Sequence, residues 1–155
     1  MKDEVQRTKD EELGRGTKGN AKSPREIGER TLEYAVRAVR LFRSLVKLKD
    51  EAARIIGRQF LRSATSVGAN IEEAHFAESR VDFIHKYRIA RKEARESLYW
   101  LRVLVESGIV SRPRLGPLIK ETEELIAIVT TIILNAKKGL GVPADKRSGN
   151  STLRP

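Results

Sequence analysis

Apolar residues recur every three or four positions through four long stretches of this chain, which predicts four amphipathic helices. The first runs from Pro24 to about Lys47, the second starts after Asp50, the third starts at Ser79, and the fourth runs from about Leu115 to Lys137. At 1.5 Å per residue each is on the order of 35 to 43 Å long. Because the connections are short, the pattern predicts an all-α, antiparallel up-down-up-down four-helix bundle.

Capping residues mark the predicted helix ends. The start signals are Ser23-Pro24 with Glu26 at the capping-box position, Asp50, and Ser79 with Asp82 three residues later. Glu106-Ser107-Gly108 ends the third helix, with Gly108 as the left-handed cap. Ser111 is expected to cap a short turn before Pro113.

The same periodicity predicts which side chains are buried. In the first helix they are Ile27, Tyr34, Ala38, Leu41, Leu45 and Leu48; in the third, Phe83, Tyr87, Ala90, Ala94, Leu98, Leu101 and Val105; in the fourth, Leu118, Ile119, Leu125, Ile128, Val129, Ile132 and Ile133. A second apolar stripe of the first helix comprises Leu32, Val36, Val39 and Val46 and lies on another face. Two stripes on one helix indicate an additional neighbour, such as another subunit.

The second helix carries unusually small residues. Gly57 and Gly68 each cost about 1 kcal/mol relative to alanine inside a helix, so each needs a structural reason. Small residues around Gly68 would let another helix approach closely. Asn70 falls on the same face as Ser63 and Val67; if buried it must be hydrogen-bonded, and it would determine helix register. Gly68 and Asn70 are therefore predicted structural residues.

Composition divides the chain into three parts. Residues 1–22 and 140–155 are predicted to be a disordered leader and a disordered tail, and residues 23–139 form the bundle. The absence of cysteine and of an apolar leader favours a soluble, cytoplasmic protein. The most apolar run, residues 125–134, is half the length of roughly 20 residues that a membrane span needs.

Basic residues outnumber acidic ones by ten, and seven of these net charges fall on residues 23–139. Helical spacing aligns them in rows, and arginine suits bidentate phosphate contacts. The predicted nucleic-acid-binding residues are Arg54, Arg58 and Arg62 on the second helix and Arg88, Arg91, Lys92, Arg95 and Arg102 on the third. The alternative is a solvated face whose charges are balanced by Glu93 and Glu96. No aromatic platform is expected along these rows; Tyr99 and Trp100 are the only candidates, and Trp100 is expected to be packed.

Two carboxylate–histidine pairs raise a metal-binding alternative. Glu72 with His75 and Asp82 with His85 have the spacing found in di-iron helical bundles, although each pair lies near a helix end. Glu33 or Glu121 would have to complete such a site. No nucleophile elbow or phosphate-binding glycine loop is present, so we predict no enzyme activity, no cofactor and no metal.

Two blocks resemble a known family, the four-helix-bundle proteins first noticed as reading frames in intervening sequences of bacterial large-subunit ribosomal RNA genes. The first block is RSATSVGANIEEA, residues 62–74; the second is Tyr87-Arg88-Ile89-Ala90 followed by Glu96-Ser97-Leu98-Tyr99-Trp100-Leu101. Where many relatives have Gly-Ser, this chain has Lys92-Glu93, which makes that face bulkier and more charged. The resemblance spans about residues 31–137.

The resemblance implies a homopentameric ring of bundles without known enzyme activity. A more distant resemblance is to the accessory protein of diversity-generating retroelements, a basic pentameric bundle that binds nucleic acid and a reverse transcriptase. Two hypotheses follow: a self-associating bundle that binds RNA or DNA through its basic faces, or a protein-interaction scaffold for a partner such as a reverse transcriptase.

Overall fold

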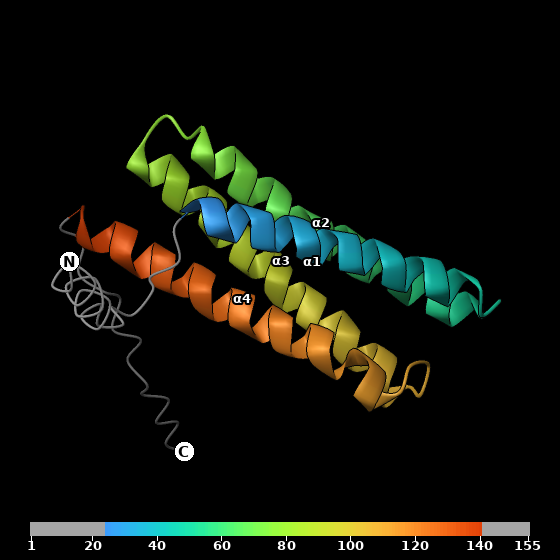
Figure 1. The fold of residues 1–155 in the computed structure, drawn as a ribbon. Coiled ribbons are helices and arrows are strands. Elements are labelled where there is room, and N and C mark those ends of the chain that lie inside the picture. Colours follow the sequence, from blue (N-terminus) through green and yellow to red (C-terminus); the bar gives the residue numbers. More distant parts are fainter. Residues whose placement is uncertain (1–23, 141–155) are drawn as a thin grey trace, which may run out of the picture.

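The computed structural model describes residues 24–140, which form four helices in sequence order: α1 (Pro24–Val46), α2 (Glu51–His75), α3 (Arg80–Glu106) and α4 (Arg112–Lys138). Figure 1 shows that successive helices run antiparallel. Neighbours in sequence pack most extensively, and α1 and α4 approach each other less closely. The predicted all-α four-helix bundle is confirmed. The predicted leader and Ser23, and the tail from residue 141 onward, lie outside the described residues.

Local capping explains where two of the helices begin. The carboxylate of Asp50 accepts hydrogen bonds from the backbone N–H groups of Ala52, at 2.8 Å, and Ala53, at 3.2 Å. The Ser79 hydroxyl accepts from the N–H of Asp82 at 3.1 Å. These bonds satisfy donors that a helix start leaves without intrahelical partners, so both predicted caps are confirmed.

The start of α4 differs from the prediction. It begins at Arg112, three residues before the expected Leu115, and the Ser111 side chain makes no capping hydrogen bond. Pro113 lies in the first turn, where its missing N–H would have had no helical partner. The short turn expected there is therefore the first turn of α4. Before it, Gly108 has φ of 73°, which confirms the left-handed residue predicted after α3.

The core follows the predicted stripe of α1 except at its end. Ile27, Tyr34, Ala38, Leu41 and Leu45 are all buried. Leu48 is exposed, contrary to the prediction, because α1 ends at Val46 and Leu48 lies in the turn that follows.

The buried faces of α3 and α4 are rotated slightly from those predicted. Phe83, Leu98 and Val105 of α3 and Ile119, Ile128 and Ile132 of α4 are only half-buried. Ile84, Ser97 and Leu104 of α3 and Leu115 and Thr122 of α4 are buried instead. The apolar pattern counted Ser97 and Thr122 as polar and so displaced the predicted face. Both hydroxyls are hydrogen-bonded, which makes their burial tolerable.

Close approach of α1 explains the two glycines of α2. A Cβ added at Gly57 would lie 2.7 Å from Cδ1 of the buried Leu45, which is too close for an undisturbed contact. A Cβ added at Gly68 would lie 3.4 Å from Oγ1 and 3.5 Å from the carbonyl oxygen of Thr31. The small-residue surface around Gly68 therefore receives α1, as a close helix contact requires.

Buried hydroxyl groups link the helices near the middle of the bundle. Tyr34 of α1 and Thr122 of α4 are 2.8 Å apart, and the Thr122 hydroxyl also lies 2.8 Å from the Leu118 carbonyl. Since Thr122 donates to that carbonyl, Tyr34 donates to Thr122. Ser97 of α3 lies 2.9 Å from Ser63 of α2. Burial raises the pKa of Tyr34 to about 12, although its interactions with the Thr122 and Ser97 hydroxyls act in the opposite direction, so its hydroxyl keeps the proton it donates.

Tyr87 presents the opposite case. Its side chain is buried and its ring lies 4.5 Å from that of Phe83, but its hydroxyl has no hydrogen-bond partner among the described residues. Burial raises the pKa of Tyr87 to about 12, with a smaller contribution from the Glu72 carboxylate. The hydroxyl of Tyr87 is therefore buried at a net cost.

We expect Gly68→Ala to be tolerated and Gly68→Leu to destabilise the fold. The alanine methyl group would make ordinary contacts with Thr31 and gain up to about 1 kcal/mol of helix propensity. The leucine side chain would push α1 away and lower the free energy of unfolding by roughly 1–3 kcal/mol. Urea denaturation followed by circular dichroism measures both. Equal stability of the leucine variant would show that α1 does not pack on this residue.

Two tyrosine-to-phenylalanine variants should differ although both side chains are buried. Tyr34→Phe removes the donor to Thr122 and should lower the free energy of unfolding by about 1 kcal/mol. Tyr87→Phe removes a hydroxyl without a partner and should leave stability unchanged or raise it by up to about 1 kcal/mol. Each variant is the control for the other in thermal or urea denaturation. A larger loss for Tyr87→Phe than for Tyr34→Phe would contradict this assignment of the hydrogen bonds.

Candidate nucleic-acid interface

The predicted basic row of α2 is exposed but partly neutralised. Arg54 forms a two-point ion pair with Glu51, with Nη2–Oε1 and Nε–Oε2 distances of 2.6 and 2.9 Å. This hydrogen bonding raises the pKa of Arg54 and lowers that of Glu51. Arg62 pairs with Glu96 of α3, and its Nη1 lies 4.0 Å from Oε2 of Glu93. Arg58, between the two, makes no ion pair with a residue of the described range.

The row of α3 is more open. Arg88, Lys92, Arg95 and Arg102 are all exposed, and none forms an ion pair within residues 24–140. Arg91 differs because it is half-buried and makes interactions of its own. Glu93 and Glu96, the acids expected to balance the basic faces, are directed to Arg62 of α2. The predicted nucleic-acid-binding residues therefore fall into two groups: those paired with an acid, such as Arg54 and Arg62, and those on α3 that are exposed and form no ion pair within the described residues.

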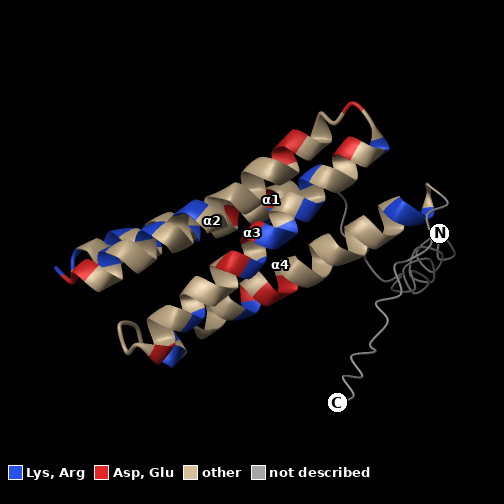
Figure 2. Cartoon of the chain, turned by 180° about the vertical axis from the view of Figure 1, so that it is seen from behind, with Lys and Arg blue, Asp and Glu red and all other residues tan. Residues whose placement is uncertain are grey.

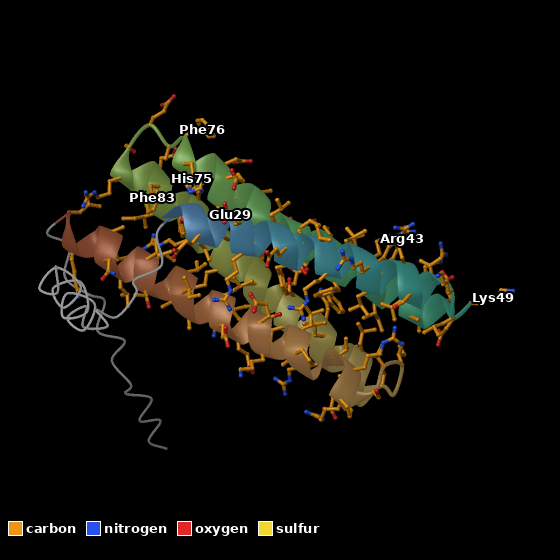
Figure 3. The ribbon with its side chains drawn as sticks, viewed as in Figure 1. Glu29, Arg43, Lys49, His75, Phe76 and Phe83 are labelled. Atoms are coloured by element: carbon orange, nitrogen blue, oxygen red, sulfur yellow. The ribbon has the colours of Figure 1, made fainter. Side chains whose placement is uncertain are left out.

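Net charge is concentrated at one end of the bundle, a feature that the predicted rows of arginines do not include. Residues 37–62 hold eight basic and two acidic residues and thus six of the seven net charges of the predicted bundle. They form the second half of α1, the turn and the first half of α2. Figure 2 shows basic residues gathered at this end of the α1–α2 pair, and in Figure 3 Arg43 and Lys49 point away from the bundle. A count of charge along the chain would have revealed this end.

The two aromatic candidates on α3 have different environments. Trp100 is half-buried, as expected, and its indole N–H donates to Glu96 at 3.2 Å. Tyr99 is 59% exposed and lies on the outer face between Arg95 and Arg102. The two rings meet edge to face with centroids 4.9 Å apart. An exposed aromatic ring therefore does accompany the basic row of α3.

The second structural residue predicted on α2 has a local role. Asn70 is half-buried rather than buried, and its amide donates to the Ser66 carbonyl of the same helix at 2.8 Å. A bond within one helix cannot select the register between two helices. The expected function of Asn70 in register is thus not supported, whereas Gly68, like Gly57, lies in close contact with α1.

The histidine pairs do not form a metal-ligand set within the described residues. His75 Nδ1 lies 3.8 Å from Glu72 Oε2, and no group of three or more histidine and acidic side chains suited to a metal occurs in residues 24–140. Glu121, one of the acids considered as a further ligand, instead bridges α1 and α4. It accepts from Nε of Arg30 at 2.6 Å, and Glu124 also pairs with Arg30. The hydrogen bond to Glu121 is the largest cause of the raised pKa of Arg30.

Comparison with known proteins identifies the family. The model of the 23S rRNA-intervening sequence protein family matches residues 28–131, which include most of all four helices. The chain belongs to this family. A crystal structure of a protein of unknown function from the S23 ribosomal protein family of Bacteroides thetaiotaomicron is 38% identical. The match covers 72% of this chain and 97% of that chain, with a TM-score of 0.68. No curated protein matches the chain.

Membership in the family agrees with the four-helix fold but does not assign a function. The function therefore has to be inferred from the side chains of this chain. A bulkier and more charged face was expected at Lys92 and Glu93, and the two residues have different environments. Lys92 is exposed, whereas one carboxylate oxygen of Glu93 is buried without a hydrogen bond among the described residues. No helix within residues 24–140 has the length and apolar character needed to cross a bilayer. Among the sites predicted from the sequence, the exposed basic surface of α3 is the one that the described residues leave available for a ligand.

Proposed function

We propose that this protein is a non-enzymatic, self-associating four-helix bundle that binds the phosphate backbone of RNA or DNA. The observation that carries the proposal is the row of exposed cations on α3, Arg88, Lys92, Arg95 and Arg102, which no carboxylate of the described residues neutralises. A cation that is already paired must give up its partner to bind a phosphate. An unpaired arginine binds phosphate without that loss and releases counterions from the polyanion.

The neutralised arginines contribute less to this binding surface. Arg54 keeps its local partner Glu51, and Arg62 keeps Glu96. Both pairs are at the surface, where ion pairs are weak, so a phosphate can still replace the carboxylate. The basic end formed by residues 37–62, which includes Arg58, adds long-range attraction that speeds association. The α3 row supplies the direct contacts, and the basic end of α1 and α2 supplies the surrounding field.

The triple variant Arg88→Gln, Arg95→Gln and Arg102→Gln should bind nucleic acid more weakly and with less salt dependence. For a single strand the slope of log K against log salt changes by about 0.7 per phosphate contact, so loss of three contacts reduces it by about 2. Fluorescence anisotropy of a labelled RNA over a salt series measures the slope. The control is Lys120→Gln, which removes an exposed cation of α4 outside both rows. It should change the slope by less than the value of about 0.7 expected for one phosphate contact. A wild-type slope near zero would remove phosphate binding as the function.

Self-association is the second part of the proposal, and the outer face of α1 supports it. Leu32, Val36, Val39 and Val46, the predicted second stripe, are between 40% and 66% exposed. Four large aliphatic side chains on one helix face, uncovered in a single chain, are typical of a protein–protein contact. Family resemblance implies five copies around a ring.

Val36→Glu combined with Val39→Glu should dissociate the assembly without unfolding the chain. Like charges would meet across the contact, whereas both side chains are already exposed in one chain. Light scattering after size-exclusion chromatography should give an assembly for the wild type and a single-chain mass of 17.5 kDa for the variant, with equal helical circular dichroism. Val81→Glu, at a residue 67% exposed on α3, is the control and should keep the assembly mass. A wild-type mass of one chain would contradict self-association.

The same apolar face of α1 supports a second candidate function. A protein partner, such as a reverse transcriptase that uses this protein as an accessory subunit, could occupy the stripe in place of another copy. The protein would then be a scaffold without intrinsic nucleic-acid affinity. Mass measurement of the purified protein before and after nuclease treatment separates the two functions. Nucleic acid that co-purifies supports phosphate binding, and an unchanged assembly free of nucleic acid supports the scaffold.

A further inference from the structure

The exposed row of α3 contains more than cations. Residues that follow one another at four- and three-residue intervals on a helix lie on one face. On α3 this face is formed by Val81, His85, Arg88, Lys92, Arg95, Tyr99 and Arg102, and all seven are exposed. From Arg88 to Arg102 the face offers a cation or an aromatic ring about every 4.5 to 6 Å along the helix axis. We call Arg88, Lys92, Arg95, Tyr99 and Arg102 the α3 track.

The ring of Tyr99 is held in place from one side. Trp100 contacts it edge to face at 4.9 Å, and Trp100 is itself fixed by its bond to Glu96, which also pairs with Arg62. This connected set extends from α2 to the α3 track. A ring that is braced by its neighbour loses little conformational freedom when a planar ligand stacks on it. Tyr99 is thus a preformed, solvent-accessible aromatic surface.

A hollow beside Tyr99 has the size and lining to receive a planar group. Its volume is about 310 Å³, and it is lined by Arg95, Leu98, Tyr99 and Arg102 of α3 and by Glu123 and Ile126 of α4. Leu98 and Ile126 provide apolar surface, while the two arginines flank the ring on α3. The Glu123 carboxylate repels phosphates. A bound strand would therefore have its phosphates on the α3 side and a base over Tyr99.

We infer that the α3 track is a single-stranded nucleic-acid site in which Tyr99 stacks on a base while Arg95 and Arg102 bind the adjoining phosphates. This inference rests on the proposed function and specifies its ligand. A duplex keeps its bases stacked on one another and presents mainly phosphates to a convex helix surface, so Tyr99 gains nothing from it. A single strand can turn a base out onto an aromatic ring, and such stacking tolerates any base.

Trp100 makes the site observable without a label. It is the only tryptophan of the chain, it is half-buried, and its ring contacts Tyr99. A base stacked on Tyr99 changes the surroundings of this single fluorophore. Binding through phosphates at a distance leaves those surroundings largely intact.

The test compares a short polyuridine strand with the same strand annealed to polyadenosine, using the full chain. Anisotropy gives the dissociation constants, and Trp100 emission reports occupancy at Tyr99. We expect tighter binding of the single strand than of the duplex, and a change of Trp100 emission with the single strand alone. Tyr99→Phe should retain the preference. Tyr99→Leu keeps bulk against Trp100 but lacks a ring face, and should weaken single-strand binding about tenfold while leaving duplex binding unchanged.

The outcomes separate this inference from the proposed function. No binding of either form at low salt would overturn both. Salt-dependent binding that is equal for the two forms, unaffected by Tyr99→Leu and silent in Trp100 emission, would overturn the single-strand site and leave phosphate binding intact. Phe76→Ala is the control, since Phe76 is 84% exposed, lies directly after α2 and before α3 begins (Figure 3), and is outside the α3 track; this variant should change neither affinity. If Tyr99→Leu loses helical circular dichroism, the Trp100 emission of the wild type decides.

Discussion

The burial of four inner helix faces around one narrow core is the constraint on which the rest of the structure depends. At the middle of that core each helix contributes a hydroxyl group, Tyr34 from α1, Ser63 from α2, Ser97 from α3 and Thr122 from α4. A buried hydroxyl without a partner costs free energy, as that of Tyr87 does, and the Tyr34–Thr122 and Ser63–Ser97 bonds avoid this cost at these four residues. Because each bond joins two helices, the hydroxyls set how the helices face one another, which apolar packing alone specifies less strictly.

The same packing decides which side chains remain at the surface. α1 fits closely onto α2 because Gly57 and Gly68 leave room for Leu45 and Thr31. That fit turns the second apolar stripe of α1 outward, where it is available for another copy or for a partner. α3 lies between α2 and α4, and one side of it provides Glu96 to Arg62 while the other presents the α3 track. A neutralised surface and an available basic surface therefore lie on two sides of one helix.

Much of the fold was predictable because its signals are local. Asp50, Ser79 and Gly108 act within a few residues of themselves, so their roles could be read from the chain. The misjudged positions share a cause. Ser97 and Thr122 are polar in sequence but buried through bonds to distant residues, and their burial rotates the inner faces of α3 and α4. Asn70 resembled a buried register residue, yet its amide found a carbonyl in its own helix.

The sequence by itself determined the number of helices, most of their ends, the outward second stripe of α1 and the rows of arginines, because periodicity and capping are properties of neighbouring residues. Only the tertiary structure decided which arginines are available. Arg62 and Glu96 are 34 residues apart in the chain and meet because α2 packs on α3, whereas Arg88, Arg95 and Arg102 form no ion pair with an acid of residues 24–140. Tyr99 was visible in the sequence beside the basic row, but the exposure of its ring in the bundle and the hollow that it shares with α4 exist only once the helices are assembled.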